Sequence, residues 1–188
     1  MLLRATNILK MKCDKHFKDF LIPICFFGWF KDNRSEAEKT FDQVLSQGIN
    51  LIQKKYNLEI LGSGGGMPDG FIHNFNISFK HYGVLPIEKA RGLLVNVTTD
   101  FLQVVNSNPK IRNYLYTFPF KGEDISLMIL IKSSDGDDLE DPFLGSMCQC
   151  RGSIRYETLK YLKTNLFPKT IKQTSETYDE AVQILKEQ

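Results

Sequence analysis

The clearest periodic segment of the sequence runs from Pro86 to Asn108 and predicts a long helix. Pro86 suits the first helical position, because its fixed φ fits a helix and its missing N–H would have had no partner there. Pro109 ends the segment, since the residue before a proline is pushed away from the α region. A wide apolar stripe indicates that this helix lies on a sheet; it consists of Ile87, Ala90, Leu94, Val97, Phe101 and Val105.

Two further helices are predicted, one near each end of the domain. Ser35-Glu36-Ala37-Glu38 has the pattern of a capping box, and the helix it begins should end near Lys55 or Tyr56. Thr174 or Ser175 is expected to cap a terminal helix, which has acidic residues early and Lys186 late. Its apolar stripe consists of Tyr178, Ala181, Val182 and Leu185.

The segment between the first two helices predicts a pair of strands. Leu58 to Leu61 is a short apolar run, and the glycine-rich stretch from Gly62 to Gly70 follows it. That stretch lacks the Lys-Ser/Thr of a phosphate loop and precedes a strand, so we interpret it as a flexible hairpin loop. From Phe71 to Tyr82, apolar and polar residues alternate with period two. This alternation assigns Phe71, His73, Phe75, Ile77, Phe79 and His81 to one face.

After the central helix the pattern changes to a run of strands. Ile125 to Lys132 is largely apolar on both faces, which is typical of a central strand. Phe143–Cys150 and Ser153–Thr158 should pair through a tight turn at Arg151-Gly152. Lys169–Gln173 is expected to form a last strand at the edge of the sheet. Its lysines would discourage pairing with the edge of another sheet.

These elements follow the order α-β-β-α-β-β-β-(β)-α. Hairpin-linked strands separated by single helices predict an α+β domain, with an antiparallel or mixed sheet of about five or six strands and the helices packed on one face. A doubly wound parallel sheet would require regular strand–helix alternation, which the pattern does not have.

Composition limits the possible functions. A length of 188 residues fits one domain with its own core. The net charge of +2 disfavours a dedicated nucleic-acid binder, because such domains carry a basic footprint. Four cysteines are too few for a disulfide scaffold in a chain of this size.

Residues 1–30 combine a basic lead with an apolar run from Phe20 to Phe30. This layout is typical of a secretory signal, and the run is shorter than the ~20 residues that a membrane-spanning helix needs. Two aspartates in the lead, Pro23 in the run and the lack of an A-x-A-like site argue against a clean signal, and Met11 is an alternative start. We predict that this segment lies outside the core and directs export or tethers the chain to a membrane, and that the domain spans residues 31–188. The alternatives are an apolar segment packed on the domain and a cytoplasmic protein.

No stretch carries a metal or cofactor signature, and we expect neither group. The acidic segment from Asp135 to Asp141 does not fit the EF-hand pattern and is interpreted as a solvated hairpin tip. Cys148 and Cys150 share one strand face, but a zinc site would need two further ligands, so we interpret them as small core or edge residues. Their oxidation state is open if the chain is exported.

Several segments together resemble small, mostly uncharacterised exported proteins of intracellular bacteria. They are KYNLEILG, NISFKHYGVLPIEKARGLLV, VNSNPKIRNYLYTFPF, DPFLGSM and ETYDEAVQIL. The resemblance covers residues 31 to the C-terminus, and its motifs look structural rather than catalytic. It implies export, with the domain beginning after the apolar N-terminal run.

Two hypotheses of function remain. The first is a non-enzymatic, exported or envelope-associated binding module for another protein, which uses an exposed sheet face or the apolar loop after the central helix. Its candidate binding residues are Arg91, Tyr114, Phe118 and Phe120. Arg91 is expected at the margin of the central helix, with its stem on apolar surface and its guanidinium outside. The second is a small hydrolase or transferase whose acid, base and nucleophile meet only in the fold, drawn from Asp135–Asp141, from His73 or His81, and from Cys148 or Cys150.

Overall fold

The computed structural model describes residues 33–161 and 168–187. All of these except Asn33 belong to one compact unit that begins at Arg34, and the segment 1–30 lies outside the described residues. The elements follow the predicted order, with the last strand present. They are α1 Glu36–Tyr56, β1 Glu59–Gly66, β2 Asn74–Tyr82, α2 Ile87–Ser107, the 3₁₀ turns η1 Arg112–Tyr114 and η2 Gly122–Asp124, β3 Ile125–Lys132, β4 Ser146–Cys150, β5 Ser153–Lys160, β6 Lys169–Thr177 and α3 Tyr178–Lys186.

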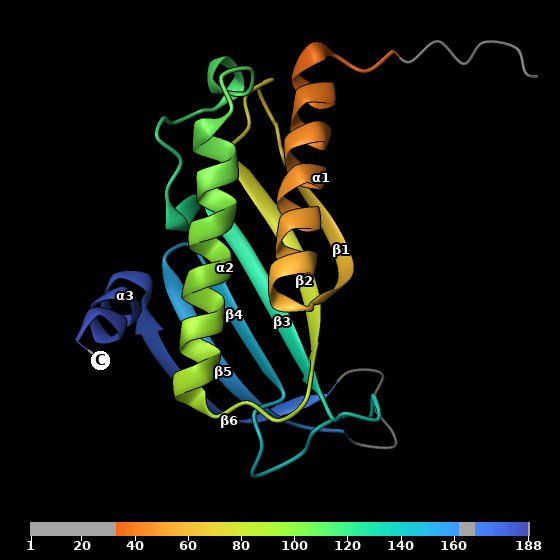
Figure 1. The fold of residues 1–188 in the computed structure, drawn as a ribbon, viewed down its shortest axis with the longest axis vertical. Helices are drawn as coiled ribbons and strands as arrows, with labels where there is room; N and C mark the ends of the chain where they lie inside the picture. The colour runs from red at the N-terminus through yellow and green to blue at the C-terminus, as the bar shows by residue number, and fades with distance from the viewer. Residues whose placement is uncertain (1–32, 162–167, 188) are drawn as a thin grey trace, which may run out of the picture. The chain divides into compact units, whose positions relative to one another are not determined.

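The strands form a mixed sheet of six strands, in the order β1-β2-β3-β4-β5-β6. Among the described strands, β2 and β3 pair in parallel, and the other neighbouring pairs are antiparallel. A parallel pair needs a crossover connection, which α2 supplies. Helices α1 and α2 lie along the same face of the sheet, with α3 beside α2 (Figure 1). The predicted α+β class and the mixed sheet are therefore confirmed.

Phenylalanine rings join the two long helices to the sheet. Phe75 of β2 is fully buried; it stacks on Phe41 of α1 with ring centroids 4.7 Å apart. Phe101 of α2 and Phe120 meet the Phe75 ring edge-on, at 5.2 and 5.7 Å. The predicted inward face of α2 is also confirmed, since Leu94, Val97 and Phe101 are buried with the residues of β2.

The two long helices approach closely where they cross this cluster. A Cβ atom added at Gly48 of α1 would lie 2.4 Å from the Phe101 ring. Glycine lowers the helix propensity of α1 at this position, but it makes room for the ring. The start of α1 is as predicted: Ser35 and Glu38 form the capping box.

The glycine-rich stretch is not a loop along its whole length, so this prediction was wrong in part. Strand β1 continues through it to Gly66 and pairs with β2. Gly65 must remain small, because a Cβ atom there would lie 2.4 Å from the Asn74 carbonyl oxygen and 2.5 Å from the Phe41 ring. Backbone pairing and this tight packing therefore outweigh the low strand propensity of glycine.

The second strand begins at Asn74 rather than at Phe71, and the predicted alternation fails at this end. Ile72 is fully buried, whereas the side chain of Phe71 is 46% exposed. The physical reason is a separate pairing: Ile72 forms an isolated parallel bridge with Leu115 outside the sheet. This pairing turns the opposite set of side chains inward.

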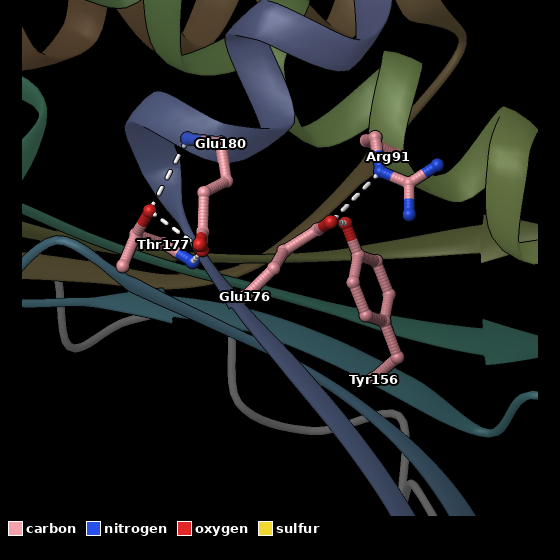
Figure 2. Close-up of polar contacts among 5 residues, drawn as sticks. All are labelled: Arg91, Tyr156, Glu176, Thr177 and Glu180. Carbon is pink, nitrogen blue, oxygen red and sulfur yellow. Dashed lines mark hydrogen bonds and ion pairs between the residues drawn. The ribbon is translucent and has the colours of Figure 1, made fainter.

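The terminal helix is capped by Thr177, not by Thr174 or Ser175. Strand β6 stays paired with β5 up to the pair Ser153 and Thr177, so the chain cannot begin a helix earlier. The Thr177 hydroxyl accepts a hydrogen bond from the Glu180 N–H at 3.2 Å, and the Glu180 carboxylate accepts one from the Thr177 N–H (Figure 2). The turn at Arg151 and Gly152 is as predicted, with both residues at positive φ.

Truncating Phe101 to Ala should lower the free energy of unfolding by about 3–5 kcal/mol, because the lost transfer energy and the remaining cavity add. Phe118→Ala is the matched control, since 44% of this phenylalanine is exposed, and it should change stability by less than about 1 kcal/mol. Urea unfolding of both variants tests the expectation. Equal effects would show that the wrong face of α2 has been placed inward.

Candidate binding surface

Two segments that are far apart in the sequence meet just before the start of β2. The Ile72 N–H donates to the Tyr114 carbonyl oxygen at 2.7 Å, and the Tyr116 N–H donates to the Ile72 carbonyl oxygen at 3.0 Å. The side chains of Ile72 and Leu115 both point into the core, where they are 0% and 7% exposed. In a parallel pairing the flanking residues then face outward on both segments.

Phe71, His73 and Tyr116 flank this pairing, and together with Arg112 and Phe118 they form what we call the aromatic surface. Tyr114, the last residue of η1, is half-buried and packs against the core. Tyr116 is 61% exposed, and Phe71 and Phe118 are about half exposed. The His73 ring stacks on Tyr116 with centroids 4.0 Å apart. The Arg112 guanidinium lies 4.2 Å from the centre of the Phe118 ring. Ring stacking and backbone pairing thus hold these side chains in place.

The structure places the predicted binding residues in different surroundings. Phe118 lies in the aromatic surface, whereas Tyr114 packs partly against the core. Phe120 is only 2% exposed and packs on Phe75. Asn106 fixes Phe120 further by bonding both its backbone N–H and its carbonyl oxygen. The two-residue spacing of Tyr114, Tyr116 and Phe118 was a signal for Tyr116, whereas Phe71 and His73 join the surface through a bridge that no local pattern reveals.

The aromatic surface includes the guanidinium of Arg112. Among the described residues, Arg112 has no acidic partner and is held only by Phe118, and the nearby Lys110 has no ion pair. Stacking on a ring leaves the edge of a guanidinium free to donate hydrogen bonds to a carboxylate. The surface therefore offers apolar rings beside an available cation.

His73 also contacts a carboxylate, which the enzymatic hypothesis would require. Its Nε2 atom lies 2.9 Å from Asp69 Oδ1, and this hydrogen bond lowers the pKa of Asp69. The other ring contact of His73 is with Tyr116. Among the described residues, no cysteine or serine side chain bonds to this pair, so it has no activated nucleophile.

The remaining catalytic candidates are not brought together. Cys148 pairs with the half-exposed Met128 on the open sheet face, whereas His81 pairs with Ile131, which is buried on the helix side. Burial raises the pKa of the Cys148 thiol, which makes it a poorer nucleophile. In the acidic segment, Asp138 forms an ion pair with Lys132. Within the described ranges, no three His, Cys, Asp or Glu side chains are grouped to hold a metal ion.

Arg91 is not a surface residue with its guanidinium outside, so this prediction was wrong. Its Nε donates to Glu176 of β6 at 2.8 Å, and the two side chains are 14% and 13% exposed. The Tyr156 hydroxyl donates to the same carboxylate at 2.5 Å, so α2, β5 and β6 meet at Glu176 (Figure 2). Glu176 raises the pKa of Arg91, and burial followed by Glu176 raises the pKa of Tyr156 strongly. Arg91 therefore stabilises the packing of α2 on the sheet.

Comparisons of this sequence and fold with protein-family models, curated proteins and solved structures gave no match. The resemblance to exported bacterial proteins therefore stays a prediction. In the described part of the chain, none of the helices has the length and apolar content that a membrane span requires.

Replacing Arg91 by Ala should lower the free energy of unfolding by about 3 kcal/mol, because it leaves the Glu176 carboxylate without its cation in a largely buried site. The double variant Arg91→Met with Glu176→Gln should recover part of that loss, since no buried charge is then left alone. Lys172→Ala is the control: it removes an exposed pair with Asp141 and should cost about 1 kcal/mol or less. Equal losses for Arg91→Ala and Lys172→Ala in urea unfolding would contradict the structural role of Arg91.

Stability should also depend on His81. Its Nδ1 atom is buried and has no hydrogen-bond partner among residues 33–161 and 168–187, and burial lowers the pKa of His81 from the ordinary value of 6.5. Below about pH 6.5 the unfolded chain binds a proton at His81 that the folded chain resists, so this contribution to stability is lost as the pH falls. The unfolding midpoint should decrease from pH 7.5 to 5.5, and it should decrease less in His81→Phe. All other side chains are the same in both proteins, so an identical decrease would contradict the role of His81.

Proposed function

We propose that this chain is a binding module for another protein, and that the aromatic surface is its contact site. The observation that carries the proposal is the combination of exposed Phe71, Tyr116 and Phe118 with Arg112, which has no acidic partner among the described residues. Tyrosine, phenylalanine and arginine are enriched at protein interfaces, whereas lysine, glutamate and aspartate are depleted there. Single exposed apolar residues are common on surfaces, but a group held at one end of a domain is typical of an interaction site.

The rigidity of the surface supports the same proposal. The bridge between Ile72 and Leu115 fixes both backbone segments, and stacking limits the rotation of the His73, Tyr116 and Arg112 side chains. Association costs conformational entropy for every side chain that it immobilises. Side chains that are already held in place lose less conformational entropy on binding, so this surface is pre-organised.

The chemistry of the surface indicates what the partner presents. Apolar side chains of the partner would pack on Phe71 and Tyr116, and a carboxylate beside them would accept hydrogen bonds from Arg112. Lys110 adds to the attraction for an acidic segment. The occupant is therefore a partner protein with an apolar segment next to an Asp or Glu.

Export or association with the cell envelope belongs to the same proposal. It rests on the basic lead and the apolar run from Phe20 to Phe30. A partner would then be another protein of the envelope or of the environment into which the chain is exported.

Site-specific photo-crosslinking of the full chain tests the proposed surface. A benzophenone amino acid at Asn113, which is exposed between Arg112 and Tyr114, should give a discrete protein adduct in the cells that produce this chain. The same probe at Gln47, exposed on α1, should not. The adduct identifies the partner, whose affinity is then measured with purified proteins.

Tyr116→Ala and Arg112→Gln should each weaken that affinity by roughly tenfold or more, the range of interface hot spots. Leu51→Ala is the matched control, because Leu51 is an apolar side chain on α1 with 41% exposure. It should leave the affinity unchanged. An adduct that persists in the Tyr116→Ala, Arg112→Gln double variant, or that contains nucleic acid, contradicts a protein partner at this surface.

A further inference from the structure

A cavity of about 330 Å³ lies at the opposite end of α2 from the aromatic surface. It is bounded by the connection from β2 to α2, by the segment before β4 and by strands β5 and β6. Its walls are mainly apolar, with Leu85, Ile87, Phe143, Leu144 and the Tyr156 ring. This volume is at the lower end of the range of about 300–1,000 Å³ for ligand pockets, which indicates a small molecule.

One polar side chain of this cavity is largely buried, whereas Gln173 and Thr174 are exposed. Thr158 of β5 lines the cavity and is only 8% exposed, and its hydroxyl makes no hydrogen bond with any described residue. The other buried hydroxyls near the sheet are bonded: Thr98 donates to Gln149, and Tyr156 donates to Glu176. Among the described residues, the fully buried polar atom without a partner is His81 Nδ1, so the Thr158 hydroxyl keeps some access to the cavity. A ligand in the cavity can therefore accept a hydrogen bond from it.

The same cavity is bounded by the first residues of α2. No side chain caps this helix, because its N-cap is Pro86. The first N–H groups of a helix have no partner within the helix and attract a negative charge. Helix α2, with 21 residues, has such an N-terminus. Lys172 lies on the rim, where it forms an exposed pair with Asp141. Glu88 in the first turn is exposed to solvent and does not line the cavity.

We propose that this cavity binds a small carboxylic acid with an apolar body, such as a medium-chain aliphatic acid. The carboxylate accepts hydrogen bonds from the Thr158 hydroxyl and from the first N–H groups of α2, with Lys172 close by. The aliphatic part packs on Leu85, Phe143 and Leu144. The Tyr156 hydroxyl is already bonded to Glu176, so Tyr156 contributes only its ring.

Amide NMR spectra of the full chain with sodium octanoate test this site. Octanoate at millimolar concentration should shift the amides of Ile87, Thr158 and Lys172. Octylammonium, which has the same tail and the opposite charge, should bind at least tenfold more weakly. Thr158→Val removes only the hydroxyl and should weaken octanoate binding about fivefold, which corresponds to one hydrogen bond. Thr170→Val, at an exposed position on β6, should bind like the unchanged chain.

A second pair of variants keeps the test independent of the folding of Thr158→Val. Phe143 and Phe71 are exposed to 44% and 46%, so neither truncation should unfold the domain. Phe143→Ala should weaken octanoate binding at least threefold, and Phe71→Ala should leave it unchanged. Equal binding of octanoate and octylammonium, equal effects of the two truncations, or no shift near Thr158 would overturn the proposal. None of these results bears on the aromatic surface, whose partner binding is measured separately.

Discussion

The aromatic packing around Phe75 holds the layers of this domain together. Phe75 lies on a central strand and contacts one ring from α1, one from α2 and Phe120, which precedes β3. All three rings pack on Phe75, so the positions of both long helices depend on this residue. The small residues follow from this arrangement: Gly48 admits the Phe101 ring, and Gly65 admits the Phe41 ring. Glycines that weaken a helix and a strand locally are thus required by the core.

Periodicity was sufficient to predict the helices and the central strands, because their burial follows the chain in regular steps. Helix α2 turns inward the residues that its stripe predicted, and α1 starts at its capping box. The predictions were wrong where contacts with a segment distant in the sequence determine the local structure. The glycines of β1 are in a strand because β2 pairs with them, and β6 extends to Thr177 because β5 continues beside it. A single sequence contains no local sign of those partners.

The same distinction explains what was predicted of the candidate site. Tyr114 and Phe118 were found as apolar residues in a loop, but the loop alone could not tell that Phe120 turns inward toward Phe75. Phe71 was expected on the buried face, and the bridge between Ile72 and Leu115 reverses that assignment. Arg91 was expected at the surface because its partner, Glu176, is 85 residues away. Long-range contacts therefore decide which of these side chains are available to a ligand and which stabilise the fold.

Helix α2 relates these features to one another. Its 21 residues span about 30 Å, so the aromatic surface beyond its C-terminal end and the cavity at its N-terminal end are too far apart to share one small ligand. Arg91 lies near the cavity end, and its bond to Glu176 attaches the edge strand β6 to the helix. Lys172 and Thr174 of that strand form one side of the cavity. The buried ion pair is thus a structural contact, but it fixes the strand on which the shape of the cavity depends. Because α2 also packs on Phe75 through Phe101, one rigid helix positions both regions against the same core.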